Sequence, residues 1–402
     1  MKWENKGHEF DEIGYLLKDK KNLYIYGAGI SSGELIWLIK KVNRWANWNI
    51  YLIDKDEVKQ REGRYGLDVL SPEQFFSMEK ENYFVIAGAY GDIADEIYEI
   101  LKTNLPEDAI IFKSFYFIYT YLTIYFAYVH DMVFFTSENM LPSTVCNLNC
   151  RDCLNFTPYI KKHSIESLDE LKRTVDLFFG AVDLIYRFQI TGGEPLLYKN
   201  LLPLLQYIDE KYRDKILRFE MVTNGTIVPS DELCEFMKEK EMYIFLDDYR
   251  MSLPDGEERY QKVKEQLIKH EVDFADNHVD RWIRMYIPEE DKHKDIPSEE
   301  ALCNKFHVCN NPWSSLWHGM ISSCNYTMYA AKADLCELKE EEYFYLEEFT
   351  PEKKKELIEF RLRFNKKGYT EFCRKCGGWT DTNVRWCQPA IQAERGIHNE
   401  ME

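Results

Sequence analysis

The sequence lacks a cluster of basic residues, which argues against a nucleic-acid partner. Its 402 residues include 69 Asp and Glu against 51 Lys and Arg, giving a formal net charge of −18. Binding to phosphate backbones relies on grouped Lys and Arg side chains. The basic run Lys353–Lys355 stands among glutamates and indicates a solvated helix face.

The sequence also lacks an apolar run long enough to span a membrane. Its most apolar stretch, Phe115 to Val129, is shorter than the roughly 20 residues that a spanning helix needs, and it contains many tyrosines. We interpret this stretch as a buried inter-domain helix. No basic and apolar export leader opens the chain, so we expect a cytoplasmic protein without a membrane span.

Eleven cysteines are present. Without export they have no oxidising compartment in which to form disulfides, and we expect several to be metal ligands. The length predicts two or three compact units, and a hydrophobic content of 45% supplies material for their cores.

The first unit alternates short apolar strands with helical patterns, which predicts a parallel α/β sheet. Strands are predicted at Leu23–Tyr26, Asn49–Ile53, Tyr83–Ala87 and Ala109–Phe112.

A glycine turn follows the first of these strands. Gly27, Gly29 and Gly33 open a helix, and Asp54 ends the next strand. Amides at such a helix start can bind phosphate, and the carboxylate can bind a ribose hydroxyl. The spacing is one residue longer than the dinucleotide fingerprint, which argues against NAD. Ligand binding and a purely structural role are equal alternatives here.

The second unit, from about Glu138, repeats the alternation of strand and helix. Strands are predicted at Met140–Val145, Ile185–Thr191, Leu217–Thr223, Tyr243–Asp247 and Trp282–Tyr286. This rhythm predicts a barrel or half-barrel with its chemistry at the C-terminal strand ends. From about Ala301 the rhythm stops and further cysteines gather.

The predicted fold class is therefore α/β. We expect a Rossmann-like parallel sheet at residues 1–113, an aromatic linker helix at 114–137, a partial (β/α)6 barrel at 138–300 and a small cysteine-rich domain at 301–402.

Three cysteines, Cys146, Cys150 and Cys153, follow the first predicted barrel strand with the spacing CxxxCxxC. Three thiolates on one loop can hold three irons of a cubane cluster and leave the fourth iron open. Zinc sites usually show two separated CxxC pairs. A zinc knuckle or a chance grouping is the alternative.

A second motif, Gly192-Gly193-Glu194-Pro195, follows the next predicted strand. Glycines let a ligand approach the backbone closely, and the carboxylate of Glu194 can accept hydrogen bonds from a cationic amine.

The cysteine loop followed by GGEP resembles the radical S-adenosylmethionine (SAM) superfamily, over about Met140 to Tyr286. The resemblance implies that Cys146, Cys150 and Cys153 hold a [4Fe–4S] cluster and that SAM chelates its open iron. Gly192, Gly193 and Glu194 would then receive the methionine amino group of SAM.

Two further positions bear on the resemblance, one that matches the family and one that departs from it. Asn224, within Thr223–Thr226, matches a place where such enzymes carry polar groups near the SAM ribose, and an ordinary Asn-Gly turn is the alternative. Asp152 stands where many members have an aromatic residue, which leaves the adenine contacts open. The implied chemistry is reductive cleavage of SAM to a 5′-deoxyadenosyl radical that abstracts hydrogen from a substrate, with a flavodoxin- or ferredoxin-like electron donor.

Four cysteines of the last segment form a further candidate metal site: Cys309, Cys324, Cys373 and Cys376. Gly319 suits a hairpin that presents the first two thiols together, and spacing alone favours a fully ligated cluster and a structural zinc equally. The spacing resembles the Twitch domain, a shorter relative of the SPASM extension, which implies one auxiliary [4Fe–4S] cluster. Cys303, Cys336 and Cys387 stay unassigned. Each could be a small buried hydrophobic residue, replace one of the proposed ligands, or donate a hydrogen atom to a substrate radical.

The stretch Cys146–Tyr159, with Asn155 and Pro158, also resembles radical SAM proteins linked with polysaccharide biosynthesis. The N-terminal segment resembles the Rossmann-like modules of such pathways. Together they imply an oxidoreductase-type enzyme acting on a nucleotide- or lipid-linked sugar by dehydrogenation, epimerisation or deoxygenation. The enzyme 2-deoxy-scyllo-inosamine dehydrogenase is a family precedent for one Twitch cluster.

Four charged residues at the strand mouths are candidate hydroxyl binders or solvated loop charges: Glu220, Asp247, Asp248 and Arg250. Two other functions remain open from the sequence. One is modification of a ribosomally made peptide, and the other is a non-catalytic iron–sulfur or zinc scaffold.

Overall fold

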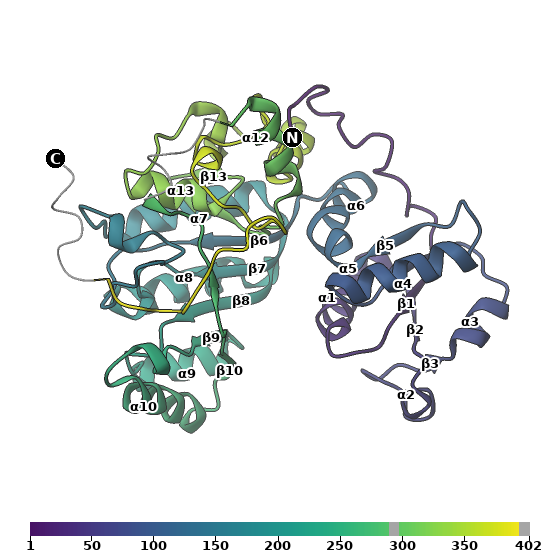
Figure 1. The fold of residues 1–402 in the computed structure, drawn as a ribbon, viewed down its shortest axis with the longest axis horizontal. Coiled ribbons are helices and arrows are strands. Elements are labelled where there is room, and N and C mark those ends of the chain that lie inside the picture. Colours follow the sequence, from purple (N-terminus) through teal and green to yellow (C-terminus); the bar gives the residue numbers. More distant parts are fainter. Residues whose placement is uncertain (289–296, 394–402) are drawn as a thin grey trace. The chain divides into compact units, whose positions relative to one another are not determined.

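The computed structural model describes residues 1–288 and 297–393. It divides into two compact units, one formed by His8–Thr136 and the other by Met1–Gly7 with Ser137–Glu402 (Figure 1). The predicted ranges 138–300 and 301–402 include residues 289–296 and 394–402, which lie outside the described part. Each unit has its own sheet.

The N-terminal unit contains a parallel five-stranded sheet in the order β3-β2-β1-β4-β5. This is the strand order of the Rossmann fold. The strands are β1 (Asn22–Tyr26), β2 (Asn49–Ile53), β3 (Val69–Leu70), β4 (Tyr83–Ala87) and β5 (Ile111–Lys113). Strand β3 was not predicted because two residues are too short to show a period.

The longer helices of this unit bury apolar side chains, whereas the short helix Glu57–Glu62 buries none of its residues. The helices of the unit are α1 (Ser32–Ala46), α2 (Glu57–Glu62), α3 (Pro72–Ser77), α4 (Gly91–Asn104), α5 (Ser114–Tyr116) and α6 (Leu122–Val129), with a π-helical turn η1 (Phe117–Tyr121) between the last two. In α1 the buried positions Leu35, Leu38, Ile39 and Val42 recur at helical spacing.

The aromatic stretch from α5 to α6 is core material of this unit. Phe117 and Phe126 are fully buried. The ring of Phe117 lies 6.0 Å from that of Phe84 on β4 and 6.1 Å from that of Trp48. Burial of these rings accounts for the long apolar stretch in the sequence. No helix in the described ranges is long and apolar enough to cross a membrane.

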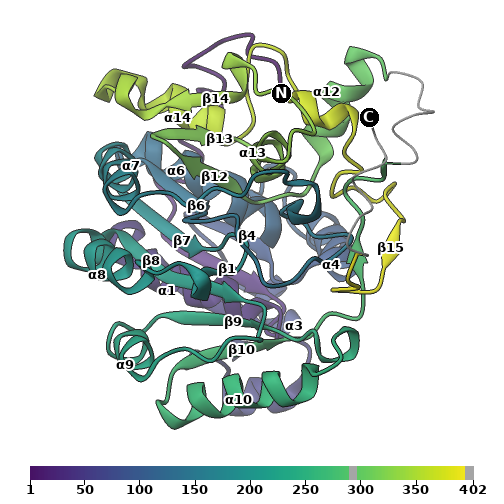
Figure 2. The ribbon, with the colours of Figure 1, turned by 90° about the vertical axis from the view of Figure 1, so that its left-hand side faces the viewer.

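The second unit is built on an eight-stranded sheet in the order β10-β9-β8-β7-β6-β12-β13-β14. Figure 2 shows these strands one after another, from β10 at the bottom to β14 at the top. The parallel strands of this sheet are β6 (Phe134–Met140), β7 (Leu184–Ile190), β8 (Ile216–Thr223), β9 (Tyr243–Asp247) and β10 (Asp273–Asn277). The helices α7 (Leu168–Ala181), α8 (Leu201–Tyr212), α9 (Asp231–Glu239) and α10 (Gly256–Lys269) alternate with them.

One face of this sheet is covered by helices. Phe178 and Phe179 of α7 lie 5.6 Å and 5.4 Å from the ring of Phe188 on β7. Ser167 caps α7 by accepting a hydrogen bond from the amide of Glu170. The alternation of parallel strands and outer helices is the partial barrel that the sequence predicts.

Two strand predictions in this unit are wrong. The first strand ends at Met140, because the backbone of Ser143 and Val145 bonds to the glycine turn at residues 191–194 instead of a neighbouring strand. Trp282–Tyr286 is not a barrel strand: β11 (Trp282–Ile283) pairs antiparallel with β15 (Trp386–Cys387). The fifth barrel strand is β10, whose sequence is too polar to show a strand period.

The cysteine-rich segment continues the barrel sheet. Strand β12 (Ser314–Trp317) runs parallel to β6, with Ser314 opposite Glu138, and β13 (Met320–Ser322) and β14 (Tyr343–Tyr345) follow antiparallel. The helices of this segment are α12 (Glu299–Val308), α13 (Asn325–Lys332) and α14 (Lys354–Arg361). The barrel and the cysteine-rich segment therefore share one sheet.

Candidate functional site

The three cysteines of the CxxxCxxC loop lie together beyond the end of β6. Cys150 is 6% exposed, and Cys146 and Cys153 are half-buried. All three pack in one apolar cluster with Leu148 and Ala390. A tight turn holds the loop, since the amide of Cys153 donates to the carbonyl of Cys150 at 3.1 Å.

The environment of these thiols disfavours negative charge. Burial, together with the neighbouring thiol of Cys153, raises the pKa of Cys146 to about 12. Burial also raises the pKa of Cys150, again with Cys153 adding to the effect. A buried group of thiols this close becomes a set of thiolates only when positive metal charge compensates them.

The glycine turn Thr191–Glu194 packs directly against the approach to the cysteine loop. The amide of Gly193 donates to the carbonyl of Ser143, and that of Glu194 donates to the carbonyl of Val145, both at 2.9 Å. A β-carbon on Gly193 would lie 2.1 Å from the oxygen of Val145. Only glycine permits this approach, which explains the Gly-Gly pair.

Asn155, two residues after Cys153, also joins the cysteine loop to the glycine turn. Its side-chain amide donates to the carbonyl of Gly192 at 2.5 Å. Gly192 has a φ of +147° and its β-carbon would lie 2.4 Å from the oxygen of Ser143. The structure therefore brings together the two motifs that the sequence singled out.

Glu194 is a buried carboxyl group at this junction, 1% exposed. It accepts hydrogen bonds from the hydroxyl of Thr223 at 2.9 Å and from the amides of Asn224 and Leu196 at 2.8 Å and 3.1 Å. Burial raises its pKa to about 7. A carboxylate offers about four acceptor positions, so one stays available for an incoming amine.

Asn224 contacts the cysteine loop itself. Its side-chain amide donates to the side-chain oxygen of Asn147 at 2.9 Å and lies 3.7 Å from the sulfur of Cys146. Thr226 joins this group by accepting a hydrogen bond from Asn147 at 2.7 Å. In this arrangement Asn224 orients the loop, and its predicted role near a ribose stays a prediction.

The donor set of the loop fits a cubane cluster. Such a cluster takes its thiolates at separate irons, and the three thiols of the loop pack in one apolar cluster. Within residues 1–288 and 297–393, no group of three Cys, His, Asp or Glu side chains is arranged to hold a single metal ion.

Two polar residues at the end of β9 lie beside the thiols. The hydroxyl of Tyr249 donates to Asp247 at 2.7 Å, and the side-chain amide of Asn277 donates to it at 2.5 Å. Burial raises the pKa of Asp247 to about 6. Tyr249 packs against the thiol group and lies edge-on to Trp282 at 5.5 Å. No pattern in the sequence singles out Tyr249, because the thiols and Trp282 that it packs against come from distant segments.

The other candidate hydroxyl binders already have partners. Arg187 binds both carboxylate oxygens of Glu220, at 2.8 Å and 3.1 Å. Arg250 binds both oxygens of Asp248, at 2.8 Å and 3.0 Å. Substrate hydroxyls would have to compete with these bidentate ion pairs.

Cys309, Cys324, Cys373 and Cys376 line one cavity of the C-terminal segment. Phe306, Tyr326 and Phe372 complete much of its wall. Burial raises the pKa of Cys324, and the neighbouring thiol of Cys309 adds to that effect. Burial likewise raises the pKa of Cys373 to about 11.

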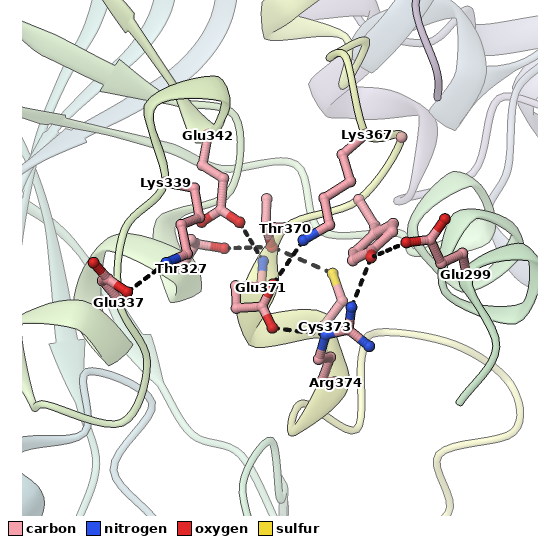
Figure 3. A network of polar contacts seen from close by, with 12 residues as sticks. Glu299, Thr327, Glu337, Lys339, Glu342, Lys367, Thr370, Glu371, Cys373 and Arg374 are labelled. Carbon is pink, nitrogen blue, oxygen red and sulfur yellow. Dashed lines mark hydrogen bonds and ion pairs between the residues drawn. The ribbon is translucent and has the colours of Figure 1, made fainter. Parts of the chain in front are cut away.

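Each of these four sulfurs has a polar partner. The amide of Gly378 donates to Cys376 at 3.2 Å and that of Trp379 to Cys309 at 3.4 Å. The side-chain amide of Asn311 donates to Cys324 at 3.4 Å. The hydroxyl of Thr370 lies 3.3 Å from the sulfur of Cys373, within the polar network that Figure 3 shows around Glu371.

Hydrogen bonds of this kind stabilise thiolates that ligate iron. The four-cysteine cavity therefore fits the predicted metal site. The three unassigned cysteines are not among the residues that line this cavity. The sulfur of Cys303 lies 3.5 Å from the carbonyl of Lys367, that of Cys336 lies 4.0 Å from the carbonyl of Thr327, and that of Cys387 lies 3.7 Å from the carbonyl of Trp282.

In the N-terminal unit, Asp54 supports the glycine turn. It accepts hydrogen bonds from the amide of Ala28 and from Lys59, both at 2.8 Å. Burial alone would raise the pKa of Asp54, but the bond from Lys59 and the amide bonds outweigh it and lower the pKa. Tyr65 donates to the carbonyl of Gly29 at 2.7 Å. Nucleotide binding here stays a prediction.

Comparison with known proteins identifies the barrel. Residues 140–289 match the Radical SAM superfamily. These residues are a radical SAM domain. Members of this superfamily use a [4Fe–4S] cluster and SAM, and the cysteine loop and glycine turn of this radical SAM domain fit both.

Two curated relatives are similar to part of this radical SAM domain. The GTP 3′,8-cyclase of Ectopseudomonas mendocina is 40% identical over 85 residues, which cover 20% of this chain and 24% of that protein. The GTP 3′,8-cyclase of Syntrophomonas wolfei is 39% identical over 85 residues, with the same coverage of 20% and 24%. The chain thus matches only about a quarter of the length of these relatives.

Solved structures give looser similarities. BtrN in complex with AdoMet and 2-DOIA has a TM-score of 0.35 and 16% identity, over 62% of this chain and 96% of that one. Native anSMEcpe with bound AdoMet has a TM-score of 0.30 and 23% identity, over 35% of this chain and 42% of that one.

Proposed function

We propose that this chain is an enzyme that cleaves SAM reductively at a cluster held by Cys146, Cys150 and Cys153 and that dehydrogenates, epimerises or deoxygenates a nucleotide- or lipid-linked sugar. When bound, the reduced [4Fe–4S] cluster and SAM supply a 5′-deoxyadenosyl radical that removes a hydrogen atom from the substrate. Dehydrogenation is the leading reaction, and epimerisation and deoxygenation are the alternatives to it.

The observation that carries this proposal is the junction between the cysteine loop and the glycine turn. The carbonyls of Ser143 and Val145 bind the amides of Gly193 and Glu194, so the turn lies against the chain that leads into Cys146. Glu194 would hold the amine of SAM with its available acceptor position, and the three thiols would hold the cluster.

The second cysteine group supports an oxidative reaction. Phe156, three residues beyond Cys153, packs edge-on against Phe372 at 5.1 Å. Phe372 lines the four-cysteine cavity and precedes Cys373. An auxiliary cluster at Cys309, Cys324, Cys373 and Cys376 would accept the second electron that a substrate radical must lose in a net dehydrogenation.

A sugar substrate is supported by the sequence around the cysteine loop. Cys146–Tyr159 resembles the radical SAM proteins of polysaccharide biosynthesis, and a Rossmann-like unit precedes it. Within this stretch, Asn155 positions the glycine turn by donating a hydrogen bond to the carbonyl of Gly192.

The test is anaerobic reconstitution followed by incubation with dithionite, SAM and one class of substrate at a time. We expect nucleotide sugars or lipid-linked sugars to raise the release of 5′-deoxyadenosine above the uncoupled rate. Release that responds only to peptides would overturn the sugar proposal. The absence of any SAM cleavage would overturn the enzymatic proposal and favour a scaffold.

A further inference from the structure

The segment Pro389–Ala393 lies along the cysteine loop, more than two hundred residues away in sequence. The amide of Arg151 donates to the carbonyl of Ile391, and the amide of Ala393 donates to the carbonyl of Asn149, both at 2.7 Å. Cys150 and Gln392 form an isolated antiparallel bridge.

Gln392 makes two side-chain contacts with this loop. Its side-chain oxygen accepts a hydrogen bond from the amide of Asn149 at 2.7 Å. Its side-chain nitrogen donates to the sulfur of Cys150 at 3.3 Å and to the carbonyl of Ala390 at 2.7 Å. One amide group therefore holds the loop backbone and a thiol at the same time.

A second residue of the segment packs against the cysteine loop. Ala390 is fully buried and packs with Leu148 and Cys150. It has a φ of +55°, a conformation that a non-glycine residue keeps only where its surroundings hold it. The carbonyl of Pro389 accepts a hydrogen bond from the hydroxyl of Ser252 at 2.5 Å, which ties the segment to the loop after β9.

We propose that Pro389–Ala393 is part of the cluster site and that Gln392 is a positioning residue that sets the reduction potential of the cluster through Cys150. The inference rests on the proposed ligation of that cluster by Cys146, Cys150 and Cys153. A hydrogen bond donated to a ligating sulfur withdraws electron density and favours the reduced cluster. Without that bond the cluster potential becomes more negative and SAM cleavage needs a stronger reductant.

The central variant is Gln392→Leu, which keeps the side-chain size and removes both polar atoms. The matched control is Gln388→Leu, because Gln388 lies in the same stretch and its side chain donates to the hydroxyl of Ser252 at 3.3 Å. Midpoint potentials of the anaerobic holoproteins are measured by titration followed with electron paramagnetic resonance, and the signal that SAM perturbs identifies the relevant cluster. We expect a negative shift for Gln392→Leu and the wild-type potential for Gln388→Leu.

Amide hydrogen exchange in the metal-free proteins gives a readout that needs no cluster. Gln392→Leu removes the acceptor of the Asn149 amide and leaves the carbonyl of Ile391 in place for the Arg151 amide. We expect exchange at Asn149 to accelerate about tenfold, the factor that one net hydrogen bond supplies, with Arg151 unchanged.

The outcomes separate the two proposals. A wild-type protein that binds no cluster at this loop would overturn the proposed function and the tuning role with it. A wild-type cluster with an unchanged potential in Gln392→Leu would overturn the tuning role alone. Equal acceleration at Asn149 and Arg151 would overturn the assignment to the Gln392 side chain.

Discussion

The amide of Glu194 donates a hydrogen bond to the carbonyl of Val145 at 2.9 Å, and this bond joins the glycine turn to the residue before Cys146. The carboxyl group of the same Glu194 bonds to the amide of Asn224, whose side chain reaches the sulfur of Cys146. The C-terminal ends of β6, β7 and β8 are thus held together by one residue.

A β-carbon at Gly193 would break this junction. In Gly193→Ala it would lie 2.1 Å from the oxygen of Val145, so the turn must move away from the cysteine loop. We expect a loss of stability on the order of 1–3 kcal/mol and weaker SAM binding by about tenfold or more, measured by denaturant unfolding and by calorimetry.

Gly180→Ala in α7 is the matched control for that change. A β-carbon at Gly180 meets no atom within 4 Å. An alanine in a helix is favoured over glycine by about 0.5–1 kcal/mol, so this variant should be at least as stable as the wild type. Equal behaviour of the two variants would contradict the close approach at Gly193.

Removal of one thiol should empty one cysteine site and leave the other filled. In Cys150→Ala the loop keeps two thiols, too few to hold the cluster, and we expect SAM cleavage to be abolished. Iron at the four-cysteine cavity should remain, because its ligands lie in a separate pocket. Iron and sulfide analysis together with 5′-deoxyadenosine release measures both effects. Cys234→Ala, a buried thiol of α9, should keep both sites.

The ligands proposed for the four-cysteine cavity can be tested by substitution in the same way. Cys376→Ser should lower the iron content of the C-terminal site, since Cys376 is one of the four thiols that line it. Cys336→Ser should retain the iron, because Cys336 is not among the residues that line this cavity. Mössbauer spectra of the reconstituted variants distinguish the sites, and iron loss in Cys336→Ser with retention in Cys376→Ser would require a different set of ligands.

Glu138 should make the stability of the metal-free protein depend on pH. It is fully buried beside Ser314, and burial raises its pKa from 4.5 to about 8. Between these values the folded state holds a proton that the unfolded chain has released, so the free energy of unfolding falls as pH rises. The stabilisation that comes from protonated Glu138 is complete below pH 4.5 and is lost as pH passes about 8. Between these values the free energy of unfolding falls by about 1.4 kcal/mol per pH unit.

Glu138→Gln removes this titration while keeping a polar group opposite Ser314. Urea unfolding at pH 5.5 and pH 7.5 is the measurement, and the variant should lose less stability between them than the wild type by about 2–3 kcal/mol. Burial also raises the pKa of Glu194 and Glu342 to about 7, and both remain in the variant, so the difference isolates Glu138. Parallel pH profiles would refute the assignment.

Much of the site was readable from the sequence because its key residues are close together in the chain. Cys146, Cys150 and Cys153 share one loop, and Gly192–Glu194 share one turn, so local spacing was enough to name them. Trp282–Tyr286 and β10 were misread for the opposite reason. β10 is a polar edge strand, and β11 is ordered only by a partner strand about one hundred residues later.

Local spacing and periodicity determined the Rossmann-like sheet, the partial barrel, the three-thiol loop and the glycine turn, because helices, strands and tight turns are encoded within a few residues. Tertiary structure alone decided that Gln392 reaches Cys150, that Asn224 contacts the cysteine loop, and that four C-terminal thiols line one cavity. Those contacts join segments separated by tens to hundreds of residues, and only the packing of the folded chain brings such segments together.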